Sequence, residues 1–251
     1  MWVIPFNNGI TSAGFSLDQR HFPLREDVTP EAEWDALLTR YPSIGEHLAG
    51  AEICGPGDRL VRGRRMQRWL SRAAGPNWAM LPTAATFLDP LHSTGNAHTL
   101  SGIERLASLF ARHVGRWDDA DFHAGLQAYD ATLQAEARLL DRIIHGCFLT
   151  LGDMQLFGAT SAFYFVPAIW AEHRRRSGLW QSHEAFLGAH DPESLTIVEQ
   201  SYDELCVLMR SPTSSATEKQ RFVDRVRQRI APYNLAGLCD PARQNLYPYP
   251  V

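Results

Sequence analysis

The chain has 251 residues, of which 45% are hydrophobic and 21% charged, and its formal net charge is −4. This is the balance of a globular protein long enough for one large domain or two small ones, and its mild acidity gives no support for a nucleic-acid or membrane-surface partner. The four cysteines form no C-x-x-C pair and no signal peptide is seen, which predicts free thiols and a cytoplasmic location.

The first 95 residues carry signals for strands and turns around one helix. Two short β-favouring runs flank Asn7-Asn8-Gly9, which predicts a hairpin. Thr29 and Pro30 have the preferences of a helix start, and Pro42 predicts the end or an interruption of that helix.

The stretches 59–75 and 77–81 are predicted to form two further strands. Five arginines lie between Arg59 and Arg68. No aromatic platform or nucleic-acid-binding motif accompanies them, so we interpret them as a solvated face or a charge-protected edge strand.

After Gly95 the pattern becomes helical. Apolar residues at three- and four-residue steps predict a helix over Leu100–Val114 and a long one over Phe122–Leu151. Two more helices are predicted around Ser194–Met209 and Thr217–Ile230, followed by an irregular tail. The sequence therefore divides into a β-rich region, residues 1–95, and a mainly helical region, residues 96–251.

Residues 154–171 carry no charge and are long enough to raise the question of a membrane span. Polar residues, a glycine and Pro167 interrupt the stretch. The sequence therefore favours a helix in a protein core, or one that lines an apolar pocket.

The common catalytic motifs are absent from the sequence. It has no G-x-G-x-x-G, P-loop, G-x-S-x-G or H-E-x-x-H motif. His183-Glu184 has no further ligands at metal spacing, so we predict no metal site and no catalytic triad.

One loop is suggestive by itself. The stretch TFLDPLHSTGNAHTL, residues 86–100, is a turn of small polar residues that leads into a helix. The N–H groups of a helix start suit an anion or an electron-rich oxygen. The alternative is an ordinary capped helix.

Together, two stretches match a family pattern. Trp2, Ile4 and Pro5 fit the second half of a W-x-W-x-I-P motif, while Asp89-Pro90 and Ser93-Thr94-Gly95 fit a D-P loop and a turn into a helix. The chain resembles the flavin-dependent halogenase-like branch of the FAD oxidoreductases, including the tryptophan halogenases, which have the p-hydroxybenzoate hydroxylase type of fold.

The resemblance implies an incomplete α+β fold. Antiparallel strands of a substrate- and flavin-side sheet, in the flavin-edge region of residues 1–95, would precede the C-terminal helical region of residues 96–251. The N-terminal dinucleotide-binding βαβ unit would lie before Met1, which falls inside the W-x-W-x-I-P motif. We therefore expect a truncated or split flavoenzyme, with FAD in the complete protein and weak or no FAD binding by this chain alone.

The resemblance also assigns the loop residues. Backbone N–H groups of Thr94, Gly95 and Asn96 would lie at the flavin edge, and Thr94 and Gly95 would also hold a halide in a halogenase. Asp89 and Pro90 would fix the loop. Thr83 replaces the aspartate that contacts the flavin ribityl chain in the family, which predicts weaker or different flavin binding.

The substrate side is predicted from the same comparison. His92 takes the place of a glutamate of tryptophan halogenases and is either a catalytic acid or base, or a packed polar side chain. The remaining wall of the substrate pocket is expected to come from four aromatic residues: Trp2, Phe163, Tyr164 and Trp170.

The function implied is that of an FAD-dependent oxidoreductase, halogenase- or monooxygenase-like, acting on an aromatic or apolar small molecule with reduced flavin and O₂. Its partners would be a flavin reductase or a chain that supplies the FAD-binding half. The alternative is a non-catalytic remnant or binding subunit, which Pro82-Thr83 in place of Gly-Asp favours.

Overall fold

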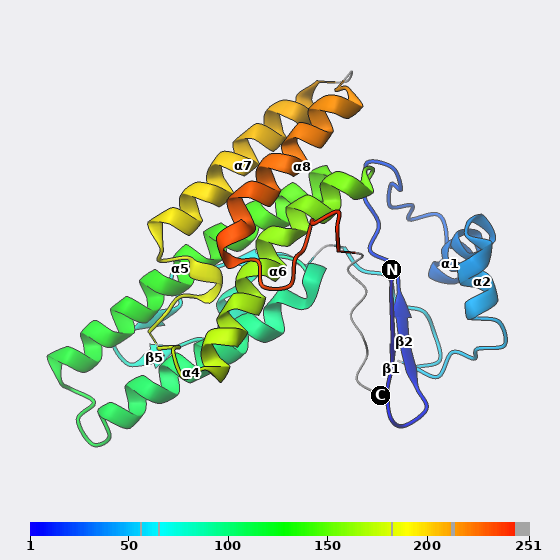
Figure 1. Cartoon of the computed structure of the whole chain (residues 1–251). Coiled ribbons are helices and arrows are strands. Elements are labelled where there is room, and N and C mark those ends of the chain that lie inside the picture. The colour runs from blue at the N-terminus through cyan, green and yellow to red at the C-terminus, as the bar shows by residue number, and fades with distance from the viewer. Residues whose placement is uncertain (56, 65, 182, 212–213, 244–251) are drawn as a thin grey trace. The chain divides into compact units, whose positions relative to one another are not determined.

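The asparagine-glycine turn near the N-terminus forms the predicted hairpin. β1 (Trp2–Pro5) pairs antiparallel with β2 (Thr11–Gly14), and Trp2 lies opposite Gly14. In the turn, Gly9 has a φ of +82°, a conformation that glycine adopts without strain. This description comes from a computed structural model, which describes residues 1–55, 57–64, 66–181, 183–211 and 214–243 (Figure 1).

Two helices follow the hairpin. Thr29 caps α1 (Pro30–Arg40) by accepting a hydrogen bond from the backbone N–H of Ala32 at 3.2 Å. Pro42 interrupts the helical run as predicted, and it begins the short helix α2 (Pro42–His47).

The prediction of a long strand over 59–75 is wrong. Of its described residues, only β3 (Arg68–Trp69) and β4 (Ala74–Gly75) are extended in ladders. The arginine side chains of this stretch hydrogen-bond to residues before α1 and at its start, and they do not protect the edge of a strand as predicted. Arg62 donates to the Val28 carbonyl oxygen at 2.9 Å, and Arg64 donates to Glu26 at 3.0 Å.

The strands of the first 95 residues are short. β3 pairs with β6 (Thr86–Phe87), and β4 pairs with β5 (Trp78–Ala79), with the four-residue helix α3 (Pro82–Ala85) between β5 and β6. With the hairpin, the described residues hold three separate two-stranded ladders rather than one sheet.

Side chains of a long helix, α5 (Ala120–Leu149), take the place of further strands beside this segment. The Tyr129 hydroxyl donates to the Met80 carbonyl oxygen at 2.7 Å, and the Gln134 amide donates to the Leu70 carbonyl oxygen at 3.0 Å. Side chains of α5 therefore provide hydrogen-bond donors for the carbonyl oxygens of Leu70 and Met80. These bonds hold the segment before the candidate site against α5.

The second region is helical as predicted, with boundaries that differ by a few residues. Its other long helices are α4 (Thr94–Arg112), α6 (Met154–Arg176), α7 (Pro192–Arg210) and α8 (Ala216–Ile230). Short 3₁₀ turns η1 (Leu91–Ser93), η2 (Phe186–Gly188) and η3 (Ala231–Tyr233) join them. Helices α7 and α8 pack together and against α5 and α6 (Figure 1). Residues 244–251 of the predicted irregular tail lie outside the described residues.

The uncharged stretch 154–171 lies in α6 and supplies part of the core, which confirms the predicted core helix. Leu156, Ala159, Ala162 and Val166 are each at most 3% exposed. In the described part of the chain, no helix is long and apolar enough to cross a membrane.

The chain divides into two compact units, Met1–Arg65 and Met66–Val251. Residues 66–95 thus belong to the same unit as the helices that follow them. The functional division at residue 95 stays a prediction.

Glycine sets the close approach of α4 to α3. A Cβ atom at Gly102 would lie 2.4 Å from Pro82 Cδ, whereas a Cβ atom at the exposed Gly158 of α6 would meet nothing within 4 Å. We expect Gly102→Ala to lower the free energy of unfolding by about 1–3 kcal/mol through overpacking. Gly158→Ala should raise it by about 0.5–1 kcal/mol, through helix propensity alone.

Chemical denaturation of the two variants measures both values. An increase in stability for Gly102→Ala similar to that for Gly158→Ala would contradict the close packing of α4 on α3.

Candidate functional site

The loop before α4 has an unusual backbone. His92 and Ser93 have φ values of +60° and +54°, a left-handed conformation that costs non-glycine residues about 1–3 kcal/mol each. Ser93 is the N-cap residue of α4 and makes no side-chain hydrogen bond to its first turn. The start of this 19-residue helix therefore lacks the side-chain cap that an ordinary capped helix has.

Four predicted cofactor residues lie around one small cavity. Thr83, Asp89, Thr94 and Gly95 line it together with His98. The cavity has room for about one water-sized particle. It lies beside the first turn of α4, where N–H groups favour negative charge.

The other two predicted residues do not line this cavity. Pro90 precedes η1 and Asn96 is exposed in the first turn of α4. The Asp89 carboxylate is buried and accepts a hydrogen bond from the Leu91 N–H at 2.9 Å. Asp89 therefore fixes the turn into η1, and this contact fits the role predicted for the Asp89-Pro90 pair.

The hydroxyl and the carbonyl oxygen of Thr83 both have hydrogen-bond partners within the chain. Its hydroxyl lies 3.0 Å from the Thr99 hydroxyl, and its carbonyl oxygen accepts from the Arg68 guanidinium at 2.8 Å. A Cβ atom at Gly95 would come within 3.0 Å of the Thr83 methyl group. Thr83 thus packs closely on the start of α4.

His92 is turned toward α5 and α6. Its ring stacks on Tyr164 at a centroid distance of 5.4 Å and meets Phe165 edge-on at 4.9 Å. Its Nε2 lies 3.5 Å from the Cys147 sulfur. Burial lowers the pKa of His92 from its ordinary value, so the ring is neutral at neutral pH. These contacts are those of a packed polar side chain, and an acid or base role stays a prediction.

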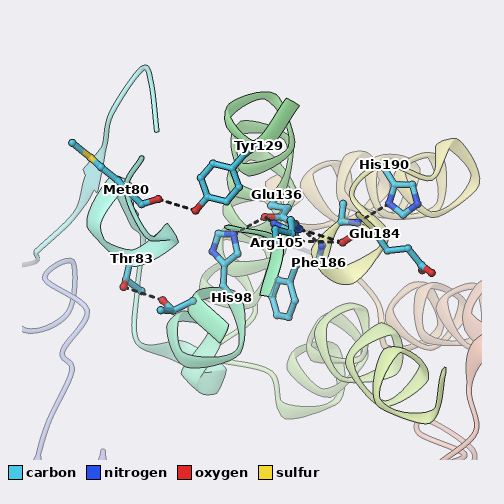
Figure 2. Close-up of polar contacts among 11 residues, drawn as sticks. Met80, Thr83, His98, Arg105, Tyr129, Glu136, Glu184, Phe186 and His190 are labelled. Carbon is cyan, nitrogen blue, oxygen red and sulfur yellow. Dashed lines mark hydrogen bonds and ion pairs between the residues drawn. The ribbon is translucent and has the colours of Figure 1, made fainter. Parts of the chain in front are cut away.

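A buried carboxylate joins several elements of the second unit (Figure 2). Glu136 of α5 is fully buried and accepts hydrogen bonds from His98 Nε2 at 2.9 Å, from the Arg105 guanidinium at 3.0 Å, and from the Phe186 N–H. Burial raises the pKa of Glu136, but the His98 hydrogen bond and the Arg105 charge outweigh it, so the pKa is lowered.

The network continues to α6. Arg105 also donates to the Glu184 carbonyl oxygen at 3.2 Å, and the Glu184 carboxylate accepts from the Arg174 guanidinium at 2.9 Å. Charged groups of alternating sign therefore join α5, α4, the segment before η2 and α6.

This network was not predicted from the sequence, although a signal is present. Glu136 is three residues after Leu133 and four before Leu140, on the apolar face of α5. An acidic residue in an apolar stripe predicts a buried partner of opposite charge. His98 and Arg105 are seven residues apart on one face of α4, which provides that partner.

A larger cavity of about 280 Å³ lies among α6, η2, α7 and η3. Phe163 and Trp170 line it, whereas Tyr164 packs on His92 instead. Trp2 belongs to the other unit, where its indole N–H donates to the Ser12 hydroxyl at 3.2 Å. Two of the four predicted pocket residues are thus brought together.

The described residues contain no group of three or more His, Cys, Asp or Glu side chains that could hold a metal ion. The cavity at the start of α4 is lined by Thr83, Thr94 and Gly95, together with the Asp89 carboxylate and His98.

No family model matches the chain. Among known proteins, it is 29% identical over 272 aligned positions to tetracycline 7-halogenase of Kitasatospora aureofaciens, covering 99% of this chain and 48% of that protein. It is 30% identical over 204 positions to monodechloroaminopyrrolnitrin halogenase PrnC of Pseudomonas fluorescens, covering 78% of this chain and 34% of that protein.

The chain belongs to the flavin-dependent halogenase-like family. This confirms the resemblance that the sequence motifs indicated. The solved structure of halogenase PltM in complex with phloroglucinol and FAD shares the fold, with a TM-score of 0.73 and 20% identity over 96% of this chain and 52% of that one. This halogenase-like chain, mostly helical with small antiparallel ladders, spans about half the length of the relatives it matches.

The packing of His92 predicts a pH effect. Its pKa is lowered from about 6.5 in the folded chain, so the unfolded chain binds more protons between the two pKa values. Its contribution to stability is complete above pH 6.5 and is lost as the pH falls from there through the folded pKa. We expect His92→Phe, measured by denaturation from pH 7.5 to 5, to lose this component of the pH dependence.

The matched control is His21→Phe, at an exposed histidine, which should keep the dependence of the unmodified chain. Parallel loss of stability in the chain and in His92→Phe would contradict a neutral, packed His92.

Proposed function

We propose that this chain is the flavin-edge and helical portion of an FAD-dependent oxidoreductase, halogenase- or monooxygenase-like. The observation that carries the proposal is the start of α4, an uncapped helix terminus beside a cavity lined by Thr83, Asp89, Thr94 and Gly95. Membership in the halogenase-like family supports it.

The arrangement fits the edge of a flavin. The N–H groups of Thr94, Gly95 and Asn96 are free of a side-chain cap, so they can stabilise negative charge on an electron-rich ring edge. Gly95 has no side chain, which leaves room for the Thr83 methyl group beside the helix start. FAD, once reduced by a partner flavin reductase, would supply the reduced flavin that reacts with O₂.

The small cavity fits a halide better than a larger anion. It has room for about one water-sized particle, and Thr94 contributes a buried hydroxyl beside the N–H groups. In the halogenase form of this proposal, Thr94 and Gly95 hold the halide. Asp89 and Pro90 hold the loop in position, and His92 braces it against α6.

An aromatic or apolar small molecule is the proposed substrate of the complete protein. The relatives carry the names of halogenases of tetracycline and of monodechloroaminopyrrolnitrin, which are small organic molecules. A flavin reductase, or a chain that supplies the FAD-binding half, is the proposed partner.

One observation favours the alternative of a non-catalytic binding subunit. Thr83, which replaces the ribityl-contacting aspartate, uses its hydroxyl on Thr99 and its carbonyl oxygen on Arg68. A flavin would therefore have to displace these contacts or do without Thr83. In either case we expect flavin binding by this chain to be weak.

Titration of the chain with FAD, followed by flavin fluorescence anisotropy, tests the proposal. We expect saturable binding with a Kd on the order of 100 µM. Thr94→Pro should weaken it about tenfold or more, because proline is tolerated at the first helical position but has no N–H. Thr94→Val is the matched control, since it loses the hydroxyl, keeps the N–H, and should bind FAD nearly as well as the unmodified chain.

Two outcomes would contradict the proposal. One is an unchanged anisotropy up to about 1 mM FAD, which would favour the binding subunit. The other is equal FAD affinity in Thr94→Pro and Thr94→Val, which would remove the backbone N–H groups from the flavin site.

A further inference from the structure

The 280 Å³ cavity has an aromatic and aliphatic wall. Rings of Phe163 and Trp170 from α6 and of Tyr233 from η3 meet Leu187 of η2 and Ile197 of α7 around it. Small-molecule sites are concave and mostly apolar, with a few polar groups that fix orientation. The volume suits a molecule of one or two rings.

The charged groups of the wall are already paired. Arg174 is held by the Glu184 carboxylate, and Arg229 donates to the Ser201 hydroxyl at 2.8 Å and also pairs with Glu204. Asp191 caps α7 by accepting from Ser194 at 2.6 and 3.0 Å. An anionic ligand would have to break one of the arginine pairs or remain without a counter-charge, so the cavity favours a neutral molecule over an anion.

Pro167 provides a hydrogen-bond acceptor in this wall. It lies inside α6 and has no N–H to donate to the carbonyl oxygen of Phe163, one turn earlier. Both residues line the cavity, and the missing N–H leaves this carbonyl oxygen without the usual helical donor. A ligand hydroxyl can donate to it.

The cavity is separate from the one at the start of α4. The residues that line the two cavities do not overlap. The Phe186 ring stacks on His98 of the small cavity at 5.5 Å (Figure 2), and its chain neighbours Ala185 and Leu187 line the large cavity.

We propose that the cavity among α6, η2, α7 and η3 is a second binding site, for one neutral aromatic molecule that carries a hydroxyl group. The rings of Phe163, Trp170 and Tyr233 contact the ligand ring, and the Phe163 carbonyl oxygen accepts its hydroxyl proton. The site binds without flavin and goes beyond the proposed function.

Calorimetric titration of the chain with three probes tests this site. Phenol is neutral and donates a hydrogen bond, anisole is neutral and cannot donate, and benzoate is ionised. We expect saturable phenol binding with a Kd on the order of 1 mM. Anisole should bind about fivefold more weakly, and benzoate more than about tenfold more weakly. No saturable phenol binding, or benzoate binding as tight as that of phenol, would overturn the proposal.

A pair of tryptophan variants locates the site. Ile197→Trp on the cavity wall should abolish phenol binding by filling the space, whereas Val207→Trp, on an exposed position of the same helix, should leave it unchanged. Circular dichroism checks that both variants fold. Full phenol binding by folded Ile197→Trp would overturn the assignment.

Amide chemical shifts of the unmodified chain give an answer even if Ile197→Trp does not fold. Phenol should shift the amides of Ala185, Leu187 and Ile197 and leave those of Thr94 and Gly95 in place. Shifts centred on Thr94 and Gly95 would place phenol at the loop instead, and would overturn the second site. FAD binding is scored separately, so failure here leaves the proposed function standing.

Discussion

The helical unit depends on one buried negative charge. The Glu136 carboxylate has no exposed surface, and leaving such a group unpaired costs several kcal/mol. The buried charge is stabilised by three donors at once. These are His98 and Arg105 on α4, and the Phe186 N–H at η2. Since these donors come from elements that are far apart in the sequence, the carboxylate fixes the position of α4 and η2 on α5 (Figure 2).

The loop before α4 takes its position from this anchor. His92 and Ser93 hold a left-handed backbone that the loop would not keep by itself. His98, one turn into α4, donates a hydrogen bond to Glu136, and the His92 ring stacks on Tyr164. Ser93 gives α4 no side-chain cap, and the N–H groups of a helix start favour an anionic or electron-rich ligand. Phe186, bound by the same carboxylate, stacks on His98 of α4.

Local patterns predicted much of this architecture. Apolar periodicity predicted the long helices, Asn7-Asn8-Gly9 predicted the hairpin, and the S-T-G motif indicated the family. The extent of the strands could not be predicted, because the backbone near Met80 is satisfied by Tyr129, a side chain about 50 residues away. The role of Glu136 could not be predicted either, because it also depends on contacts between residues far apart in the sequence. Its position on the apolar face of α5 signals a buried partner, but only the packing of α4 on α5 identifies that partner.

Amide hydrogen exchange in Glu136→Gln tests the role of this carboxylate most directly. We predict that exchange rises by about 10²-fold or more at both Phe186 and the His98–Gly102 turn of α4, as expected for breaking a buried ion pair. Val226→Ala is the matched control, because it opens a void at a fully buried position of α8 and touches no charge. If Glu136→Gln raised exchange only in the uniform pattern of Val226→Ala, the carboxylate would not be what holds the start of α4 and η2 in place.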